Sequence, residues 1–406
     1  MGKCGVRKKA RRRLLIAAGA GLMLAAGTGG SAASTATPDC PASLDCVVIP
    51  AAYGPDGHGG YGNYDQANRP ADGLTIDSIV IHDTEYPYPG TVSAFTDPAH
   101  HAAANYLVQS STGDVTEMVR PRDVAWATGN WYYNTHSVSI ENEGFAAAGF
   151  TPAEYTSDAA LVRYLARRYG VPLDREHIVG HDNVGGVTDA ENATQHTDPG
   201  PHWNWDYFMS LVRGQSEPAY LASQGSVGVH GHHVVTISPR SASNSVYLRT
   251  RPSPAAPLLS DPTPHPGITK SENWSATAIA GGQYVLAGQS GDWTGIWFGG
   301  QIGWFRDPPG PGATARFTGA WAVTPRPGLA AVPVYGGASP EDPALAYRLR
   351  AGQAYVTAGP VPDDDYDAAY GSSGTVIHGR RPYYQVQFNS RLYYVNADDV
   401  TLKYLR

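Results

Sequence analysis

The sequence predicts an α/β domain followed by two small all-β barrels. Between about residues 45 and 214, apolar strand-like segments alternate with amphipathic helical segments, a pattern typical of α/β domains. After about residue 231, the pattern changes to short apolar segments separated by prolines and glycines, without helical periodicity. The length of 406 residues also fits two or three domains, because a typical domain has about 150 residues.

Four strands are expected in the α/β domain. Residues 76–81 are rich in isoleucine and valine, which is typical of a buried strand. Residues 103–109 and 114–119 flank a Ser-Thr-Gly turn at 111–113, so we expect them to pair as a hairpin. Residues 137–143 form the fourth strand candidate.

The best-specified helix is predicted to begin after Thr151 and to end at Gly170. Thr151 and Glu154 form a capping-box pattern, and Pro152 stands at the first helical position. Apolar residues recur at helical spacing at Tyr155, Val162, Leu165 and Tyr169. A shorter helix is expected over residues 203–212.

Residues 215–231 contain glycine and serine and are predicted to be a linker. Two segments after it resemble each other, since each holds an apolar strand, a Gly-Gln turn and a terminal aromatic strand at similar spacing. We therefore expect one barrel at about 232–308 and a second at about 320–406. Because the repeat is degenerate, one larger β domain remains the alternative.

The first 33 residues have the features of a secretory signal peptide. The chain has 29 Lys and Arg against 36 Asp and Glu, a net charge of −7. Residues 1–33 hold seven of the basic residues and no acidic one, so residues 34–406 carry −14. A basic stretch precedes an apolar run at 14–26 and small residues that end at Ala33. We therefore expect a secreted or cell-wall protein after cleavage near Ala33. An uncleaved anchor is the alternative, and the choice between Sec and twin-Arg export stays open.

The region after the signal is acidic and contains only two lysines, Lys270 and Lys403. A nucleic-acid binder needs a basic surface, so we expect no nucleic-acid partner, and no second apolar run is long enough to span a membrane. Cys40 and Cys46 are an even pair in an oxidising compartment, which predicts a disulfide within an N-terminal arm at 34–70. Two free thiols are the alternative.

Three residues form a pattern that suits zinc. His82 and His181 each follow a short apolar strand-like segment, and Asp198 lies in a turn that prolines and a glycine fix. Two imidazoles and one carboxylate are typical zinc ligands and leave the fourth position open for water. The spacing contains no HExxH helix, which excludes a zincin-type metallopeptidase.

Four motifs in this region together resemble the zinc-dependent N-acetylmuramoyl-L-alanine amidases, the family that includes peptidoglycan recognition proteins. The motifs are IVIHDTE, AWxxGNWYYNTHSVSIENEG, GHDNV and HTDPGPHWNW. The resemblance implies an amidase domain at 71–214 with a central mixed β-sheet flanked by helices. It also implies one zinc ion per chain, held by His82, His181 and Asp198.

The resemblance implies hydrolysis of the amide between N-acetylmuramic acid and the L-alanine of the stem peptide, with peptidoglycan as the partner. The family's catalytic glutamate falls on Glu141. Glu143 lies two residues further along the same strand and points to the same face, so geometry alone does not choose between them. Family members that only bind peptidoglycan lack a metal ligand, so a non-catalytic peptidoglycan-binding protein is the alternative.

Several positions depart from the family's pattern. Many members have a lysine where this chain has His196, and the α/β domain contains no lysine. We expect His196 to supply the donor for the oxyanion, with a charge that depends on pH. Ala127 and Asn105 also depart from the pattern, and their effect on the rate stays open.

Aromatic residues flank the expected site. Trp126 and Trp131, together with Asn130, are predicted to contact the substrate, because flat aromatic faces suit stacking on sugar rings. Core packing is the alternative. The two C-terminal barrels resemble bacterial Src-homology-3-like domains, which bind peptidoglycan in wall hydrolases, and a spacer role is the alternative. We expect a monomer.

Overall fold

The computed structural model describes residues 37–215, 233–238, 245–261, 276–308, 314–372 and 374–406. The predicted signal peptide at 1–33, and the predicted linker at 215–231 beyond its first residue, lie outside the described residues. In the part of the chain that is described, no helix combines the length and the apolar composition needed to cross a bilayer.

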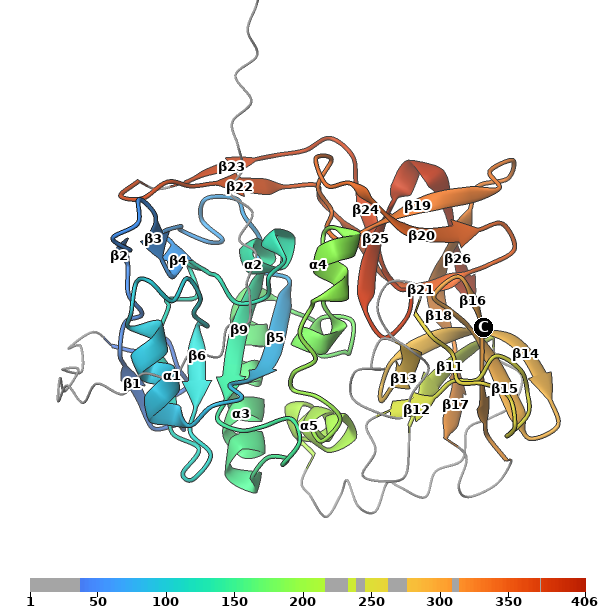
Figure 1. Cartoon of the computed structure of the whole chain (residues 1–406), viewed down its shortest axis with the longest axis horizontal. Coiled ribbons are helices and arrows are strands. Elements are labelled where there is room, and N and C mark those ends of the chain that lie inside the picture. The colour runs from blue at the N-terminus through green and yellow to red at the C-terminus, as the bar shows by residue number, and fades with distance from the viewer. Residues whose placement is uncertain (1–36, 216–232, 239–244, 262–275, 309–313, 373) are drawn as a thin grey trace, which may run out of the picture. The chain divides into compact units, whose positions relative to one another are not determined.

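Six strands form one mixed sheet in the N-terminal half (Figure 1). In their order across the sheet they are β1 (Cys46–Val48), β7 (Val115–Glu117), β6 (Tyr106–Val108), β9 (Ser137–Asn142), β5 (Ser78–Asp83) and β10 (Ile178–Gly180). β6 and β7 are antiparallel, as the predicted hairpin requires, and the other neighbours are parallel. These strands confirm the predicted α/β class. Strand β5 lies two residues later than the strand predicted at 76–81, so it includes His82.

Helix α3 (Pro152–Tyr169) covers one face of this sheet and has the predicted ends. The Thr151 hydroxyl accepts a hydrogen bond from the Glu154 backbone N–H, and the Glu154 carboxylate accepts one from the Thr151 N–H. Gly170 ends the helix with a φ of 78°. Helix α5 (Trp205–Val212) begins two residues after the predicted start, because the Asn204 side chain caps it. The core on this face contains Ile79, Ile81, Leu161, Val162, Leu165 and Phe208.

Several short elements are not predicted from the sequence. The helices are α1 (Tyr88–Phe95), α2 (Trp131–His136) and α4 (Asp189–Ala193), and the 3-10 turn η1 (His181–Asn183) follows β10. Strand β2 (Gly54–Pro55) pairs with β3 (Tyr61–Gly62), and β4 (Tyr64–Asp65) pairs with β8 (Val124–Ala125). Such elements are too short to produce a recognisable hydrophobic period.

The C-terminal half consists of antiparallel strands, as predicted. The first sheet has the order β16 (Gln301–Arg306), β15 (Trp293–Phe298), β14 (Gln283–Ser290), β11 (Val234–Ile237) and β17 (Ala315–Thr318), and β12 (Ser245–Tyr247) pairs with β13 (Thr277–Ile279). The second sheet has the order β20 (Ala344–Arg350), β19 (Ala331–Tyr335), β25 (Leu392–Asn396), β24 (Tyr383–Gln387), β21 (Tyr355–Val361), β18 (Ala320–Pro325) and β26 (Val400–Leu405). β22 (Asp365–Asp367) pairs with β23 (Thr375–Ile377), and the 3-10 turn η3 (Ala397–Asp399) precedes β26. Because β17 pairs with β11, the first sheet extends beyond residue 308, where the sequence places its end.

The second C-terminal sheet packs on the face of the central sheet that α3 leaves open. Side chains alternate along β5, so Val80 and His82 point away from the α3 side. Val80 and Val179 share one apolar cluster with Ala338, Tyr383, Leu392 and Tyr394 of the C-terminal half. A second sheet thus buries this face, and His82 lies on the same face.

Close backbone contacts accompany this packing. A β-bridge joins Val184, just after η1, to Leu392 of β25. Gly336 approaches Gly186 so closely that a Cβ on Gly336 would lie 2.0 Å from the Gly186 carbonyl oxygen. Any side chain at this position would push the two segments apart.

The N-terminal arm is tied to the central sheet and to α3. A disulfide joins Cys40 to Cys46, which is the first residue of β1. The Asp39 backbone N–H donates to the Glu117 carboxylate at 2.6 Å, and the Asp39 carboxylate pairs with Arg168 of α3 at 3.2 Å.

Candidate metal centre

His82, His181 and Asp198 meet at one edge of the central sheet. β5 and β10 are parallel neighbours, so His82 near the end of β5 and His181 directly after β10 lie at the same edge. The Nδ1 atoms of these histidines are 3.1 Å apart. The carboxylate of Asp198, from the loop before α5, lies 3.2 Å from the Nδ1 of His82 and 3.1 Å from the Nδ1 of His181. All three side chains are buried.

This spacing fits a tetrahedral metal ion. Ligand atoms bound to zinc at their usual distances lie about 3.3 Å from one another, close to the three observed separations of 3.1–3.2 Å. Two protonated Nδ1 atoms facing each other at 3.1 Å would repel, whereas two nitrogen lone pairs suit a shared cation. The residues therefore form a group that could hold a metal.

Hydrogen bonding and burial prepare these side chains as ligands. The Nε2 of His181 lies 3.0 Å from the Thr128 carbonyl oxygen, which can only accept, so Nε2 carries the proton and Nδ1 keeps its lone pair. Burial, and next the proximity of His181, lower the pKa of His82 to about 4, so it is neutral at pH 7. Burial acts to raise the pKa of Asp198, but His181 and hydrogen bonds from the neighbouring histidines lower it well below its ordinary value. Metal binding requires these protonation states.

Glu141 lies beside this group on the neighbouring strand. It is the register partner of His82 across β5 and β9, so both side chains point to the same face. Its Oε2 atom is buried and has no hydrogen-bond partner among the described residues. Burial, followed by the charges of Asp198 and Asp83, raises the pKa of Glu141 well above its ordinary value. A carboxyl group in such a setting is suited to accept and return a proton.

Glu143, the other glutamate of this segment, forms hydrogen bonds with residues outside the ligand group. Its carboxylate accepts hydrogen bonds from the backbone N–H groups of Tyr88 at 2.7 Å and Ser110 at 2.9 Å, and from the Ser110 hydroxyl at 2.8 Å. Burial acts to raise the pKa of Glu143, but these hydrogen bonds hold it below its ordinary value. The structure thus separates two glutamates that the strand period leaves equivalent.

His196 lies at the open side of the ligand group. Its Nδ1 is 3.4 Å from an Asp198 oxygen, and its ring centroid is 4.7 Å from that of His181. The side chain is 55% exposed, in contrast to the buried ligands. A hydrogen bond to Asp198 raises the pKa of His196 above its ordinary value. His196 therefore combines contact with the ligand group and access from solvent.

The three predicted substrate contacts lie in different surroundings. Trp126 is half-buried, and its indole N–H donates to the Asp65 carboxylate at 2.8 Å. Trp131 is also half-buried, and its indole N–H donates at 3.1 Å to Asp365, the first residue of β22. Asn130 is fully buried.

The Asn130 side chain forms hydrogen bonds within the fold. Its oxygen accepts from the Tyr133 N–H and caps α2, while its nitrogen donates to the carbonyl oxygens of Gly185 at 2.7 Å and Gly336 at 2.8 Å. Asn130 thereby links the loop that carries Thr128 to the loop after His181 and to the second C-terminal sheet.

Arg391 is a supporting residue that sequence reasoning misses. It is fully buried, and its Nη1 donates to the backbone and side-chain oxygens of Asn192 at 2.8 and 3.0 Å. Its Nε lies 3.4 Å from the carbonyl oxygen of Asp182, the residue after His181. Asn183 donates to the Ser390 carbonyl oxygen at 3.0 Å. The segment 390–391 thus holds both ends of the loop that begins at His181, but it lies 199 residues from Asn192 in the chain, so no local pattern reveals the contact.

Known proteins resemble the part of the chain that carries this site. Residues 72–201 match the family described as N-acetylmuramoyl-L-alanine amidase. N-acetylmuramoyl-L-alanine amidase A of Achromobacter lyticus is 28% identical over 155 residues, which cover 34% of this chain and 83% of the relative. The 1,6-anhydro-N-acetylmuramyl-L-alanine amidase AmpD of Salmonella typhimurium strain SL1344 is 29% identical over 124 residues, 29% of this chain and 62% of the relative. The crystal structure of a selenomethionine AmpD derivative is 25% identical, covers 43% of this chain and 97% of its own, and superposes with a TM-score of 0.34.

The matched residues contain β5, β9 and β10, the three strands that position the site, and all three members of the ligand group. The part of the chain that carries the candidate metal centre is therefore similar to N-acetylmuramoyl-L-alanine amidases.

Proposed function

We propose that the protein is a secreted, zinc-dependent peptidoglycan hydrolase that cleaves the amide between N-acetylmuramic acid and L-alanine. The convergence of His82, His181 and Asp198 beside Glu141 carries the proposal, since water activation by zinc needs such ligands and a nearby base. The names of the relatives, which are muramyl-L-alanine amidases, support the choice of bond. The composition of residues 1–33 supports secretion.

Each residue has a separate task in this reaction. Zinc, when bound, lowers the pKa of a coordinated water to about 7 and so supplies a nucleophile at neutral pH. His82, His181 and Asp198 would hold the ion. Glu141 takes a proton from the attacking water and passes it to the leaving nitrogen of L-alanine. His196 donates a hydrogen bond to the carbonyl oxygen on which negative charge develops.

Chelator-sensitive release of peptide tests the proposed function. We expect the mature protein to release stem peptides with a free N-terminal alanine from soluble muropeptides, as measured by mass spectrometry. Removal of the metal by a chelator should lower the rate roughly a thousandfold, and added zinc should restore it. Binding of muropeptides without release would instead favour a non-catalytic peptidoglycan-binding protein. Release that persists after chelation would contradict the metal mechanism.

Replacing His196 by alanine should lower kcat by about a hundredfold, because removal of one donor to a developing oxyanion costs at least that much. The zinc content should not change, because three other residues hold the ion. His202→Ala removes another exposed histidine of the same domain and serves as the control. An equal kcat for His196→Ala and His202→Ala would exclude His196 from the reaction.

We also propose that Trp126 contacts the substrate. Its ring packs against Tyr61 with centroids 5.3 Å apart, and Tyr61 packs against Tyr370, which is 48% exposed. The cluster thus offers an aromatic surface two residues from Thr128, whose carbonyl oxygen contacts His181. The C-terminal sheets, with their resemblance to Src-homology-3-like domains, would provide further contact with the wall.

A further inference from the structure

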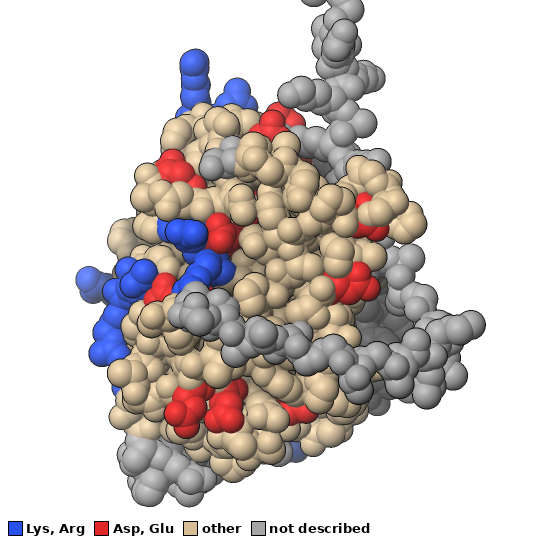
Figure 2. Space-filling view, turned by 90° about the vertical axis from the view of Figure 1, so that its left-hand side faces the viewer, with Lys and Arg blue, Asp and Glu red and all other residues tan. Residues whose placement is uncertain are grey.

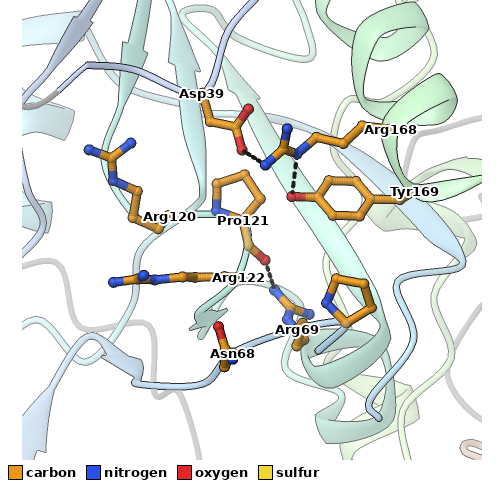
Figure 3. Close-up of a pocket in the computed structure, with 9 residues that line it drawn as sticks. Asp39, Asn68, Arg69, Arg120, Pro121, Arg122, Arg168 and Tyr169 are labelled. Carbon is orange, nitrogen blue, oxygen red and sulfur yellow. Dashed lines mark hydrogen bonds and ion pairs between the residues drawn. The ribbon is translucent and has the colours of Figure 1, made fainter. Parts of the chain in front are cut away.

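A cavity of about 650 Å³ lies in the N-terminal half, apart from the metal centre (Figure 3). Its walls come from the N-terminal arm, the loop after β4, the loop between β7 and β8, and the end of α3. Arg69, one of its residues, donates to the carbonyl oxygen of Ser137, the first residue of β9. Glu141 lies further along that strand, roughly 13 Å away at a rise of about 3.3 Å per residue. The cavity is therefore near the opposite end of β9 from the metal centre.

Four arginines line this cavity: Arg69, Arg120, Arg122 and Arg168. The Arg122 side chain is 64% exposed, and its closest carboxylate contact, with Asp123, is 3.9 Å long. Arg168 is 51% exposed and is held by Asp39 and by the Tyr169 hydroxyl, each at 3.2 Å (Figure 3). A guanidinium group has five N–H donors, so these contacts leave donors on Arg122 and Arg168 for a further acceptor.

Arg69 adds a buried donor with an unmet hydrogen bond. It is 3% exposed, and its two terminal nitrogens donate to backbone carbonyl oxygens of Pro121, Asp123, Asn134, Thr135 and Ser137. Its Nε, in contrast, has no hydrogen-bond partner among the described residues. An unsatisfied buried N–H is costly and calls for an explanation, and the residue that carries it lines the cavity.

The charge of the cavity is opposite to that of the chain. Residues 34–406 carry −14, yet the cavity is lined by four arginines and one carboxylate, that of Asp39. Figure 2 shows lysines and arginines gathered in one part of the face on this side of the molecule. A concave site with positive charge concentrates anions, and the planar guanidinium fork matches the oxygens of a phosphate group.

We propose that this cavity is a binding site for a phosphate group, with Arg122 and Arg168 as the exposed donors and Arg69 as a buried positive charge in its wall. Free phosphate and the phosphodiester of a cell-wall polymer share this chemistry. Binding of the wall polymer rests on the proposed function, because a polymer bound in the cavity would hold the enzyme close to its substrate in the wall.

Two binding experiments with the full mature chain test the proposal. Calorimetric titration with inorganic phosphate measures the binding of free phosphate. Co-sedimentation with purified cell walls, before and after acid extraction of their phosphodiesters, measures the binding of the polymer. We expect the double substitution Arg122→Gln/Arg168→Gln to weaken binding by about tenfold or more, since hydrogen bonds between charged groups are lost. This applies to whichever of the two ligands the wild-type protein binds.

The matched control is Arg167→Gln/Arg213→Gln, which removes the same charge from exposed residues outside the cavity. This pair should change binding by less than about threefold, because Arg167 and Arg213 lie outside the cavity and act on a bound anion only through screening solvent. Binding of inorganic phosphate, or sedimentation that depends on wall phosphodiesters, supports the site and identifies its source. The proposed site would be overturned if, at low ionic strength, the protein neither bound inorganic phosphate nor sedimented in a way that depends on wall phosphodiesters. It would also be overturned if the control pair weakened binding as much as Arg122→Gln/Arg168→Gln.

Amidase activity separates this proposal from the proposed function. Arg122→Gln/Arg168→Gln should release peptide from soluble, phosphate-free muropeptides at the wild-type rate, because the cavity is not part of the metal centre. A wild-type protein that binds phosphate but releases no peptide would disprove the proposed function and leave the anion site standing.

Discussion

Replacing Glu141 by glutamine is expected to lower kcat for peptide release by about 10²- to 10⁴-fold while zinc stays bound. Glutamine keeps the shape of the side chain but cannot take a proton from water. The ion should remain, because its proposed ligands are His82, His181 and Asp198. The measurements are kcat and KM on soluble muropeptides and the zinc content of the purified variant.

The stability of Glu141→Gln shows whether lost activity reflects chemistry. Burial and neighbouring carboxylates disfavour the charge of Glu141, as its raised pKa shows. An uncharged isostere should therefore unfold at the same denaturant concentration as the wild type or at a higher one. A variant that loses both activity and stability would point to a structural role instead.

Glu143→Gln is the matched control, two residues along the chain. Its carboxylate accepts hydrogen bonds from Tyr88 and Ser110, so an amide in its place should cost about 1 kcal/mol of unfolding free energy. Its kcat should stay within about threefold of the wild type, because the side chain performs no proton transfer. The opposite ranking of the two variants would transfer the catalytic role to Glu143.

Features that depend on local chemistry could be predicted from the sequence. The ends of α3 follow from the side chains of Thr151 and Glu154 and from Gly170, all of which act on neighbouring backbone groups. The meeting of His82 and His181 follows from parallel strands that end at one edge. In both cases the determining contacts lie within the element or in its nearest neighbour.

Features that depend on distant segments could not be predicted. Asn130 is a polar residue between two tryptophans, which suggests a surface contact, yet its amide is buried against Gly185 and Gly336. The apolar residues Val80 and Val179 predict that their face is covered, but not that β25 and its neighbours cover it. Only the tertiary structure shows that the second C-terminal sheet is built into the domain that carries the site.

Replacing Arg391 by alanine should lower the unfolding free energy by about 3–5 kcal/mol, the usual effect of removing one member of a buried charged network. The substitution removes two hydrogen bonds to the Asn192 oxygens and a positive charge from the surroundings of the buried Asp182 carboxylate. Because Asp182 directly follows His181, zinc affinity should also fall by about 10- to 100-fold, as is usual when residues that support metal ligands are lost. Denaturant unfolding and chelator competition with the full chain measure the two effects.

Two further variants separate support of the metal loop from general stability. Arg348→Ala removes an arginine of the same sheet that donates to the nearby carbonyl oxygens of Leu345 and Tyr347, so it should leave zinc affinity unchanged. Arg391→Lys keeps the charge but not the planar fork, so it should recover part of the stability and little of the zinc affinity. If Arg391→Ala and Arg348→Ala bound zinc equally well, the C-terminal sheet would cover the domain without positioning its ligands. A selective loss in the Arg391 variants would instead make this sheet part of the metal centre, because the geometry of His181 would then depend on a residue far along the chain.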